Sequence, residues 1–298
     1  MYINSLLLKS KEEKIISFAD DTAILYRDDS WAELKKKAES GFGRVQKWFK
    51  YNKLSLNIEK TKYLSFTSYE TGLPRLGPLE IDDTTSIPET ESTKYLGIVI
   101  DRHLRWDKHV DTTVRKIRGL LYKFRYFKTY IGIIHLRILY FALVHSLISY
   151  GIVGWGGAYR KQIKKIETVQ KWVLRIIYGK PLTSSSNELY SLANIMDPYQ
   201  VFSYTAILKV FSGKFHLSVV EHVYSTRKKN NCFRIKRAQK RIGQKSFTYL
   251  IPKLFTLVPK EIQSITDLVR AKKKLKEWIL KSDRNLFRRT VNQESWWG

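Results

Sequence analysis

The chain has little cysteine and no pattern of metal-binding histidines. Its 298 residues include one cysteine, Cys232, and six scattered histidines. A single cysteine excludes an intrachain disulfide and every zinc site that needs several cysteines of this chain. Free of disulfides, the chain suits a reducing, intracellular compartment, and we expect either the nucleus or the cytoplasm.

Carboxylates are also scarce relative to cations. The sequence has 27 Asp and Glu residues against 54 Lys and Arg residues, a formal net charge of +27. Such an excess repels itself in a compact chain unless a polyanion neutralises it, which indicates nucleic acid or an anionic membrane surface as partner. Hydrophobic residues make up 43% of the chain and aromatic residues 13%, enough for packed cores and for stacking on bases.

One long run lacks formal charge. Residues 138–159 contain no Asp, Glu, Lys or Arg and are long enough to span a bilayer. The run contains His145 and the glycine-rich sequence G-I-V-G-W-G-G at 151–157, which interrupts a helix. We therefore predict a buried helix followed by a glycine-rich loop and no membrane partner; a membrane-associated protein that uses this run is the alternative.

A pair of aspartates stands out near the start of the chain. The stretch K-I-I-S-F-A-D-D-T-A-I-L-Y-R at 14–27 places two apolar runs on either side of Asp20 and Asp21. This pattern predicts a β-hairpin with the two acids at its turn. Adjacent carboxylates at an exposed tip can hold hard divalent cations such as Mg²⁺ and leave room for phosphate oxygens. The alternative is that both residues serve only the turn, which Asp favours.

The first hundred residues predict an α+β layer. Ser30 and Glu33 match a capping box at the start of a helix, and its apolar residues recur on one face, namely Leu34, Ala38, Phe42, Val45, Trp48 and Phe49. Gly41 and Gly43 predict a kink or close packing in this helix. We predict strands at 54–57, 63–67, 79–81 and 94–100.

Beyond Trp106 the apolar period becomes helical. We predict helices at 110–124, 134–150, 163–176, 187–195, 199–211 and 267–280, with the third ending at Gly179-Lys180-Pro181. A basic tract at 226–245 contains no acid; its cations are Arg227, Lys228, Lys229, Arg234, Lys236, Arg237, Lys240, Arg241 and Lys245. Most charge runs are only solvated segments, but in a chain this basic we expect the tract to bind phosphates of nucleic acid.

Several motifs, in order, resemble a known family. F-A-D-D-T at 18–22, L-N-I-E-K-T-K at 56–62, K-Y-L-G-I-V-I-D at 94–101 and L-R-W-D-K-H-V at 104–110 resemble the reverse transcriptases of non-LTR, jockey-type retrotransposons. I-E-T-V-Q-K-W-V-L-R-I-I-Y-G at 166–179 and I-G-Q-K-S-F-T-Y at 242–249 extend the resemblance over essentially the whole chain. The A-D-D core alone is weakly specific, whereas several motifs in the same order are strongly so.

The resemblance implies roles for matching positions. Asp20 and Asp21 resemble the palm aspartates that hold two Mg²⁺ (or Mn²⁺) ions for nucleotidyl transfer. Lys60 resembles a lysine near the incoming triphosphate, with an exposed lysine beside a strand as the alternative. Tyr95, Leu96 and Gly97 resemble the primer grip, in which a tight glycine turn approaches the primer; the alternative is an ordinary palm strand. The implied partners are an RNA template and a DNA primer or target DNA.

The family also has a third palm carboxylate and fingers upstream of its A-D-D motif, whereas 19 residues precede Asp20 here. We therefore expect the C-terminal part of a reverse transcriptase. Its parts would be the end of an α+β palm at 1–103, a helical thumb-like region at 104–180 and a basic helical region at 181–298. We expect this chain alone to be inactive as a polymerase. The alternative is a nucleic-acid-binding remnant without catalysis that uses the basic tract at 226–245. The sequence does not indicate an oligomeric state.

Overall fold

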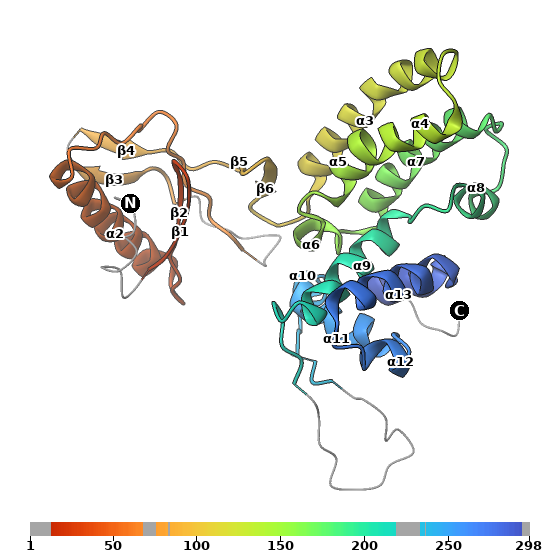
Figure 1. The fold of residues 1–298 in the computed structure, drawn as a ribbon. Coiled ribbons are helices and arrows are strands. Elements are labelled where there is room, and N and C mark those ends of the chain that lie inside the picture. Colours follow the sequence, from red (N-terminus) through yellow and green to blue (C-terminus); the bar gives the residue numbers. More distant parts are fainter. Residues whose placement is uncertain (1–12, 68–75, 83, 219–232, 236, 294–298) are drawn as a thin grey trace, which may run out of the picture. The chain divides into compact units, whose positions relative to one another are not determined.

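The computed structural model describes residues 13–67, 76–82, 84–218, 233–235 and 237–293. The chain forms two compact units, Met1–Leu104 and Arg105–Gly298 (Figure 1). We call them the N-terminal and the C-terminal unit and describe each by itself. The division into three parts at 103/104 and 180/181 stays a prediction.

In its described part, the N-terminal unit contains three two-stranded antiparallel sheets. Strand β1 (Lys14–Phe18) pairs with β2 (Asp21–Leu25), β3 (Leu79–Asp82) with β4 (Thr85–Ile87), and β5 (Ser92–Tyr95) with β6 (Ile98–Asp101). The predicted hairpin over 14–27 and the predicted strand over 79–81 are confirmed. Together with one long helix, these strands make the described part of the unit an α+β layer, as predicted.

Helix α2 (Trp31–Tyr51) holds two of these hairpins on its apolar face. Ala38 and Phe42 pack with Leu79 of β3 and Ile87 of β4. One turn further along the helix, the buried side chains of Val45 and Trp48 pack against the inward face of β1 and β2, at Ile15 and Ile24. The apolar face predicted from the sequence is confirmed, and it orients the β1–β2 hairpin.

Three local predictions for the N-terminal unit are wrong. Residues 54–57 and 63–67 form turns and irregular segments, and Tyr63 makes only an isolated bridge with Glu89. Residues 94–100 are two strands, because Leu96 and Gly97 form a two-residue turn with φ values of 45° and 81°. An apolar run does not reveal a tight turn in its middle, since both strands of a hairpin continue the same pattern.

The capping box at the start of α2 is also wrong. The side chain of Ser30 makes no capping hydrogen bond. Glu33 instead forms an exposed ion pair with Lys36, at 3.2 Å between Oε1 and Nζ. Asp28 supplies the turn before the helix, because its Oδ1 accepts a hydrogen bond from the backbone N–H of Asp29 at 2.8 Å.

Gly41 allows α2 to approach the base of the β1–β2 hairpin. A Cβ atom at this position would lie 2.5 Å from a ring carbon of Tyr26 and 2.7 Å from Oε1 of Glu13. Two residues further along, a Cβ at Gly43 would meet only the Cγ2 atom of Ile81, at 4.0 Å. The close packing predicted for this pair of glycines therefore occurs at Gly41.

These two glycines give a matched test of the packing. Gly43→Ala should raise the free energy of unfolding by up to about 1 kcal/mol, because alanine favours helix and the site has room. Gly41→Ala should lower it by about 1–3 kcal/mol, because the new methyl group overlaps the Tyr26 ring. Urea unfolding followed by circular dichroism measures both variants. Equal effects of the two substitutions would contradict the close approach.

The described part of the C-terminal unit is all helical apart from connections. Its longer helices are α3 (Asp107–Lys128), α7 (Arg160–Tyr178), α9 (Pro198–Phe211), α11 (Phe247–Thr256), α13 (Leu268–Lys281) and α14 (Arg284–Asn292). Its shorter helices are α4 (Ile133–Leu139), a π-helix η1 (Tyr140–His145), α5 (Ser146–Ser149), α6 (Ile152–Trp155), α8 (Ser186–Ala193), α10 (Arg241–Gln244) and α12 (Lys260–Gln263). All six predicted helices are confirmed, with a π-helical insertion in the one at 134–150.

Five helices were not predicted: α6, in the predicted glycine-rich loop, and α10, α11, α12 and α14 in the last sixty residues of the chain. The third predicted helix does end at Gly179, whose φ of 64° gives a left-handed C-cap. Among the described residues, no helix has the length and apolar character that a membrane crossing requires.

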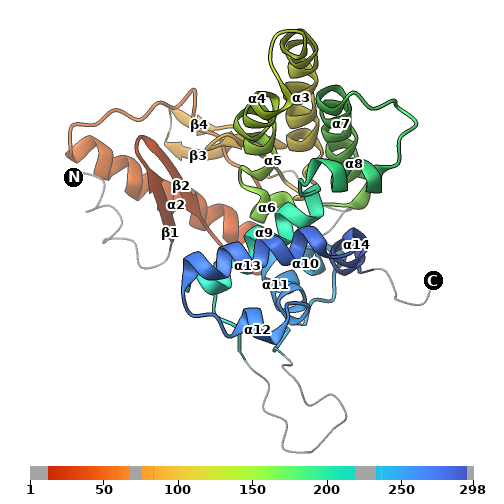
Figure 2. The ribbon, with the colours of Figure 1, turned by 45° about the vertical axis from the view of Figure 1, so that its right-hand side comes forward.

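Helix α9 lies at the centre of the C-terminal unit and packs against α6, α7, α11, α13 and α14 (Figure 2). It buries Tyr199, Val201, Phe202, Ala206 and Ile207, which point in several directions around the helix axis. Asp197 and Gln200 form a capping box at its start, and burial raises the pKa of Asp197 to about 6. The amide of Gln200 also donates to the carbonyl of Ile279 in α13, at 2.7 Å.

A buried polar contact joins α7 to its neighbours. The amide of Gln170 donates to the hydroxyl of Tyr140 at 2.7 Å and to the carbonyl of Met196 at 2.9 Å. Its carbonyl oxygen accepts from the hydroxyl of Tyr190 at 2.7 Å. Burial raises the pKa of both tyrosines, so both hydroxyls keep their protons at neutral pH. Buried polar groups satisfied in this way fix the relative positions of helices.

Candidate functional site

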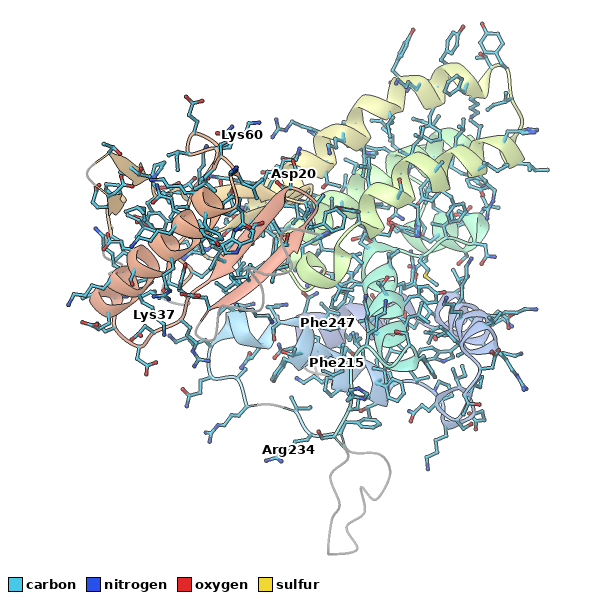
Figure 3. The ribbon with its side chains drawn as sticks, turned by 60° about the vertical axis from the view of Figure 1, so that its left-hand side comes forward. Asp20, Lys37, Lys60, Phe215, Arg234 and Phe247 are labelled. Carbon is cyan, nitrogen blue, oxygen red and sulfur yellow. The ribbon has the colours of Figure 1, made fainter. Side chains whose placement is uncertain are left out.

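Asp20 and Asp21 lie at the tip of the β1–β2 hairpin, where Figure 3 labels Asp20. Phe18 pairs with Asp21, so the turn consists of Ala19 and Asp20. Ala19 has a φ of 51°, in the left-handed region that L-residues avoid. Both carboxylates are exposed. The tight turn therefore presents two adjacent carboxylates to solvent on a hairpin that α2 holds from one side.

The opposite face of the hairpin is apolar and uncovered in the described N-terminal unit. Side chains that alternate with those facing α2 are exposed: Ile16 by 41%, Phe18 by 65% and Leu25 by 42%. Phe18 is the cross-strand partner of Asp21. The carboxylate pair thus borders an exposed apolar surface.

The described residues do not make a complete metal centre. Within them, no group of three or more His, Cys, Asp or Glu side chains lies close enough to hold a metal ion. Mg²⁺ takes about six oxygen ligands, of which adjacent carboxylates supply only a part. The Mg²⁺ or Mn²⁺ implied by the resemblance stays a prediction.

The nearest upstream carboxylate in the described chain has another role. The side chain of Glu13 is only 4% exposed and forms an ion pair with Arg44 of α2. It also lies beside Tyr26, whose pKa is raised by burial and by the charge of Glu13. The five residues of β1 separate Glu13 from the turn at the hairpin tip, a span of roughly 20 Å at about 3.3 Å per residue. Glu13 therefore stabilises the base of the hairpin.

Lys60 lies on a turn at residues 58–60. The strand predicted before it, at 54–57, is absent, so Lys60 does not flank a strand there. Its backbone N–H donates to Oδ1 of Asn57 at 3.1 Å, and the hydroxyl of Thr61 donates to the carbonyl of Asn57 at 2.8 Å. Its side chain is exposed (Figure 3). No ion pair or hydrogen bond of the described residues joins Lys60 to Asp20 or Asp21, so its role stays a prediction.

Tyr95 is the last residue of β5, and Leu96 and Gly97 form the turn between β5 and β6. Positive φ values at both central residues are typical of a type I′ hairpin turn. The hydroxyl of Tyr95 is buried and has no hydrogen-bond partner among the described residues. The tight glycine turn expected here is present, and its contact with a primer stays a prediction.

The basic tract is described only in part. Arg227, Lys228, Lys229 and Lys236 lie outside the described residues. Of the remainder, Arg234, Arg237 and Lys240 are exposed, and Figure 3 shows Arg234 pointing away from the helices. Arg241 stacks over the ring of Tyr159 at 5.4 Å. Lys245 donates to the carbonyl of Val291 at 3.0 Å and thereby ties α10 to the end of α14.

The sequence reasoning missed a row of exposed tyrosines, two on α3 and one just beyond its end. Tyr122, Tyr126 and Tyr130 are spaced four residues apart and are 73%, 52% and 71% exposed. The rings of Tyr126 and Tyr130 lie 5.0 Å apart. Exposed Lys123 and Arg125 belong to the same helix. Their four-residue spacing is visible in the sequence, but these tyrosines lie outside the apolar face from which the helix was predicted. Rings and cations in this arrangement suit stacking on bases.

Comparison with curated proteins identifies relatives of the chain. It is 25% identical over 168 residues to the probable RNA-directed DNA polymerase from transposon X-element of Drosophila melanogaster, 55% of this chain and 18% of that protein. It is 26% identical over 184 residues to the probable RNA-directed DNA polymerase from transposon BS of the same species. That match covers 61% of this chain and 20% of the relative. It is 24% identical over 177 residues to the RNA-directed DNA polymerase from mobile element jockey of Drosophila funebris. That match covers 58% of this chain and 19% of the relative.

No family model matches the chain, and no solved structure matches it significantly. Its curated relatives are all RNA-directed DNA polymerases of mobile elements. The chain is thus related to the reverse transcriptases of non-LTR, jockey-type retrotransposons, and this resemblance is confirmed over 55–61% of its length. It spans about a fifth of the length of the curated relatives it matches.

Proposed function

We propose that the chain is a part of an RNA-directed DNA polymerase of a non-LTR retrotransposon, supplying palm and thumb elements for target-primed DNA synthesis. The observation that carries this proposal is the Asp20–Asp21 pair on a tight hairpin turn, in a chain related to such polymerases. Two-metal nucleotidyl transfer needs carboxylates on a rigid element, since the metals contact both the attacking and the leaving oxygen.

In this function, Asp20 and Asp21 hold Mg²⁺ or Mn²⁺, Lys60 faces the triphosphate, and the Tyr95–Leu96–Gly97 turn contacts the primer end. The exposure of both carboxylates and of Lys60 supports the assignment, and so does the left-handed backbone of the Leu96–Gly97 turn. RNA template and DNA primer or target DNA are the partners.

We expect the 298-residue chain alone to be inactive. Its two exposed carboxylates hold metal weakly, and positioning of template and nucleotide supplies most of the catalysis in phosphoryl transfer. Purified protein with Mg²⁺ or Mn²⁺, dNTPs and a primed RNA template should give no extension above background. Extension that Asp20→Ala abolishes and Asp29→Ala, a change at another exposed carboxylate, leaves unchanged would refute the inactivity.

A chimaera tests the polymerase function directly. In it, this chain replaces the corresponding segment of the Drosophila funebris jockey polymerase. We expect primer extension that falls at least about 100-fold in Asp20→Ala and in Asp21→Ala, because each removes a metal ligand from the reacting centre. Asp29→Ala is the control. Full activity of the Asp20→Ala and Asp21→Ala chimaeras would exclude a catalytic role for this pair.

The second candidate function is nucleic-acid binding without catalysis, favoured by the exposed tyrosines of α3. Removal of one stacked ring costs about 1–3 kcal/mol per base, so Tyr126→Ala should weaken binding of single-stranded RNA by about 5- to 150-fold. Tyr51→Ala, a change at a tyrosine that is 87% exposed at the end of α2, is the matched control. Asp21→Ala should bind as the wild type does. Fluorescence anisotropy with labelled RNA measures all three; equal losses at Tyr126 and Tyr51 would refute the α3 surface.

A further inference from the structure

The C-terminal unit contains a basic cavity of about 220 Å³ lined by residues of α7, α8, the start of α9 and α14. Five cationic side chains line it, and one carboxylate accompanies them: Arg160, Lys164, Lys171, Arg284, Arg288 and Glu167. Four of these six residues come from α7 at positions 160, 164, 167 and 171, a spacing that places them on one face of the helix. The other two, Arg284 and Arg288, belong to α14, more than a hundred residues further along the chain.

The two arginines of α14 are fixed before any ligand arrives. Arg284 donates to the carbonyl of Ser186 at 3.1 Å and to the side chain of Asn187, and it stacks over the Tyr190 ring at 4.6 Å. Arg288 donates to Oε1 of Glu167 at 2.9 Å. Guanidinium groups held in this way lose little conformational freedom when they bind an anion.

The lysines of α7 complete the positive wall. Lys171 donates to the hydroxyl of Ser186 at 3.0 Å. Burial and the charges of Arg175, Arg288 and Arg284 lower the pKa of Lys171, against a raising influence of Glu167. Lys164 is exposed, and its ammonium group has no partner among the described residues. The cavity therefore concentrates positive charge that its single carboxylate does not neutralise.

Size and lining decide which anion fits. The volume of 220 Å³ is below the 300–1,000 Å³ or so that sites for drug-sized ligands occupy. The only aromatic lining residue is Tyr199, which is buried and has the Arg288 guanidinium over its ring at 5.8 Å. The cavity thus offers no open ring for a base, and it has room for a phosphate group and not for a whole nucleotide.

We propose that this cavity, the α7–α14 pocket, binds a phosphodiester group of a nucleic-acid backbone and anchors the strand on the C-terminal unit. The choice of nucleic acid as the source of the phosphate rests on the proposed function. Inorganic phosphate or pyrophosphate has the same chemistry, and the experiment separates the two sources.

The test uses the full chain and matched pairs of substitutions. Lys164→Gln combined with Lys171→Gln removes two pocket charges. Lys272→Gln combined with Lys273→Gln removes two exposed charges of α13, which do not line the pocket. Affinity for a labelled single-stranded RNA is measured from 50 to 200 mM salt. The pocket variant should bind about 5- to 20-fold more weakly at 100 mM salt, with a salt slope smaller by about 1, whereas the control should change less than about twofold.

A change of opposite sign strengthens the test. Glu167→Gln removes the pocket's only carboxylate and releases Arg288, so RNA affinity should rise by about two- to fivefold. Glu277→Gln adds the same net charge on α13 and should leave affinity nearly unchanged. Equal losses in the two lysine variants, or equal effects of the two glutamate variants, would overturn the pocket. Lys164→Gln alone, at an exposed side chain, decides the matter if thermal unfolding shows that the double variant does not fold.

A separate measurement distinguishes failure of the proposed function from failure of the pocket. If the wild type binds neither RNA nor duplex DNA, the nucleic-acid assignment is overturned together with the proposed function. Titration with inorganic phosphate and pyrophosphate, followed by thermal unfolding, then tests the anion chemistry alone. Saturable stabilisation that disappears in the pocket variant would show a site for free phosphate, and its absence would overturn the pocket for every source.

Discussion

The shortage of carboxylates constrains every other feature of this protein. With 54 cations and 27 acids, one-to-one pairing would leave half of the basic side chains without an acidic partner. Several cations of the C-terminal unit contact other electron-rich groups: Arg118 lies over Trp172, Lys253 over Tyr249, and Arg137 donates to Tyr178 and to the carbonyl of Ala193. Rings and carbonyls hold a cation in place but do not cancel its charge. The folded chain therefore keeps a strong positive field, which only a polyanion relieves.

Helix α9 positions the helices that carry the cations of the α7–α14 pocket. Because its first six residues, 198–203, are all buried, the helices around it pack against one rigid element. Two of them, α7 and α14, carry all five cations of the α7–α14 pocket, and Tyr199 of α9 itself lines it. The hydroxyl of Tyr199 also accepts from Asn292 of α14 at 3.1 Å. The geometry of the pocket thus follows from the apolar core beneath it, so substitutions in α9 would disturb anion binding without touching a cation.

Sequence periodicity predicted the elements whose packing is local. The long helices repeat apolar residues over many turns, and the β1–β2 hairpin closes within a dozen residues. Asp20 was therefore placed correctly in its turn, while Asp21 is the first residue of β2. Periodicity failed where a single backbone angle decides, as at Gly97, whose φ of 81° turns one apolar run into two strands. It also failed at the pocket. Glu167 and Arg288 meet across 121 positions, and no local pattern in one sequence indicates such a contact.

The surroundings of Asp20 and Asp21 limit which groups can complete a metal site at the hairpin tip. Helix α2 covers one face of the β1–β2 hairpin, and Glu13 is held by Arg44 at the far end of β1. No further acid of the described residues clusters with Asp20 and Asp21. If Asp20 and Asp21 hold a metal as proposed, further ligands can come from water, from phosphate oxygens of the substrate, or from a group that approaches across the face that carries Ile16, Phe18 and Leu25. That face is apolar, so a polypeptide segment packed on it would both exclude water and bring its own side chains beside Asp21.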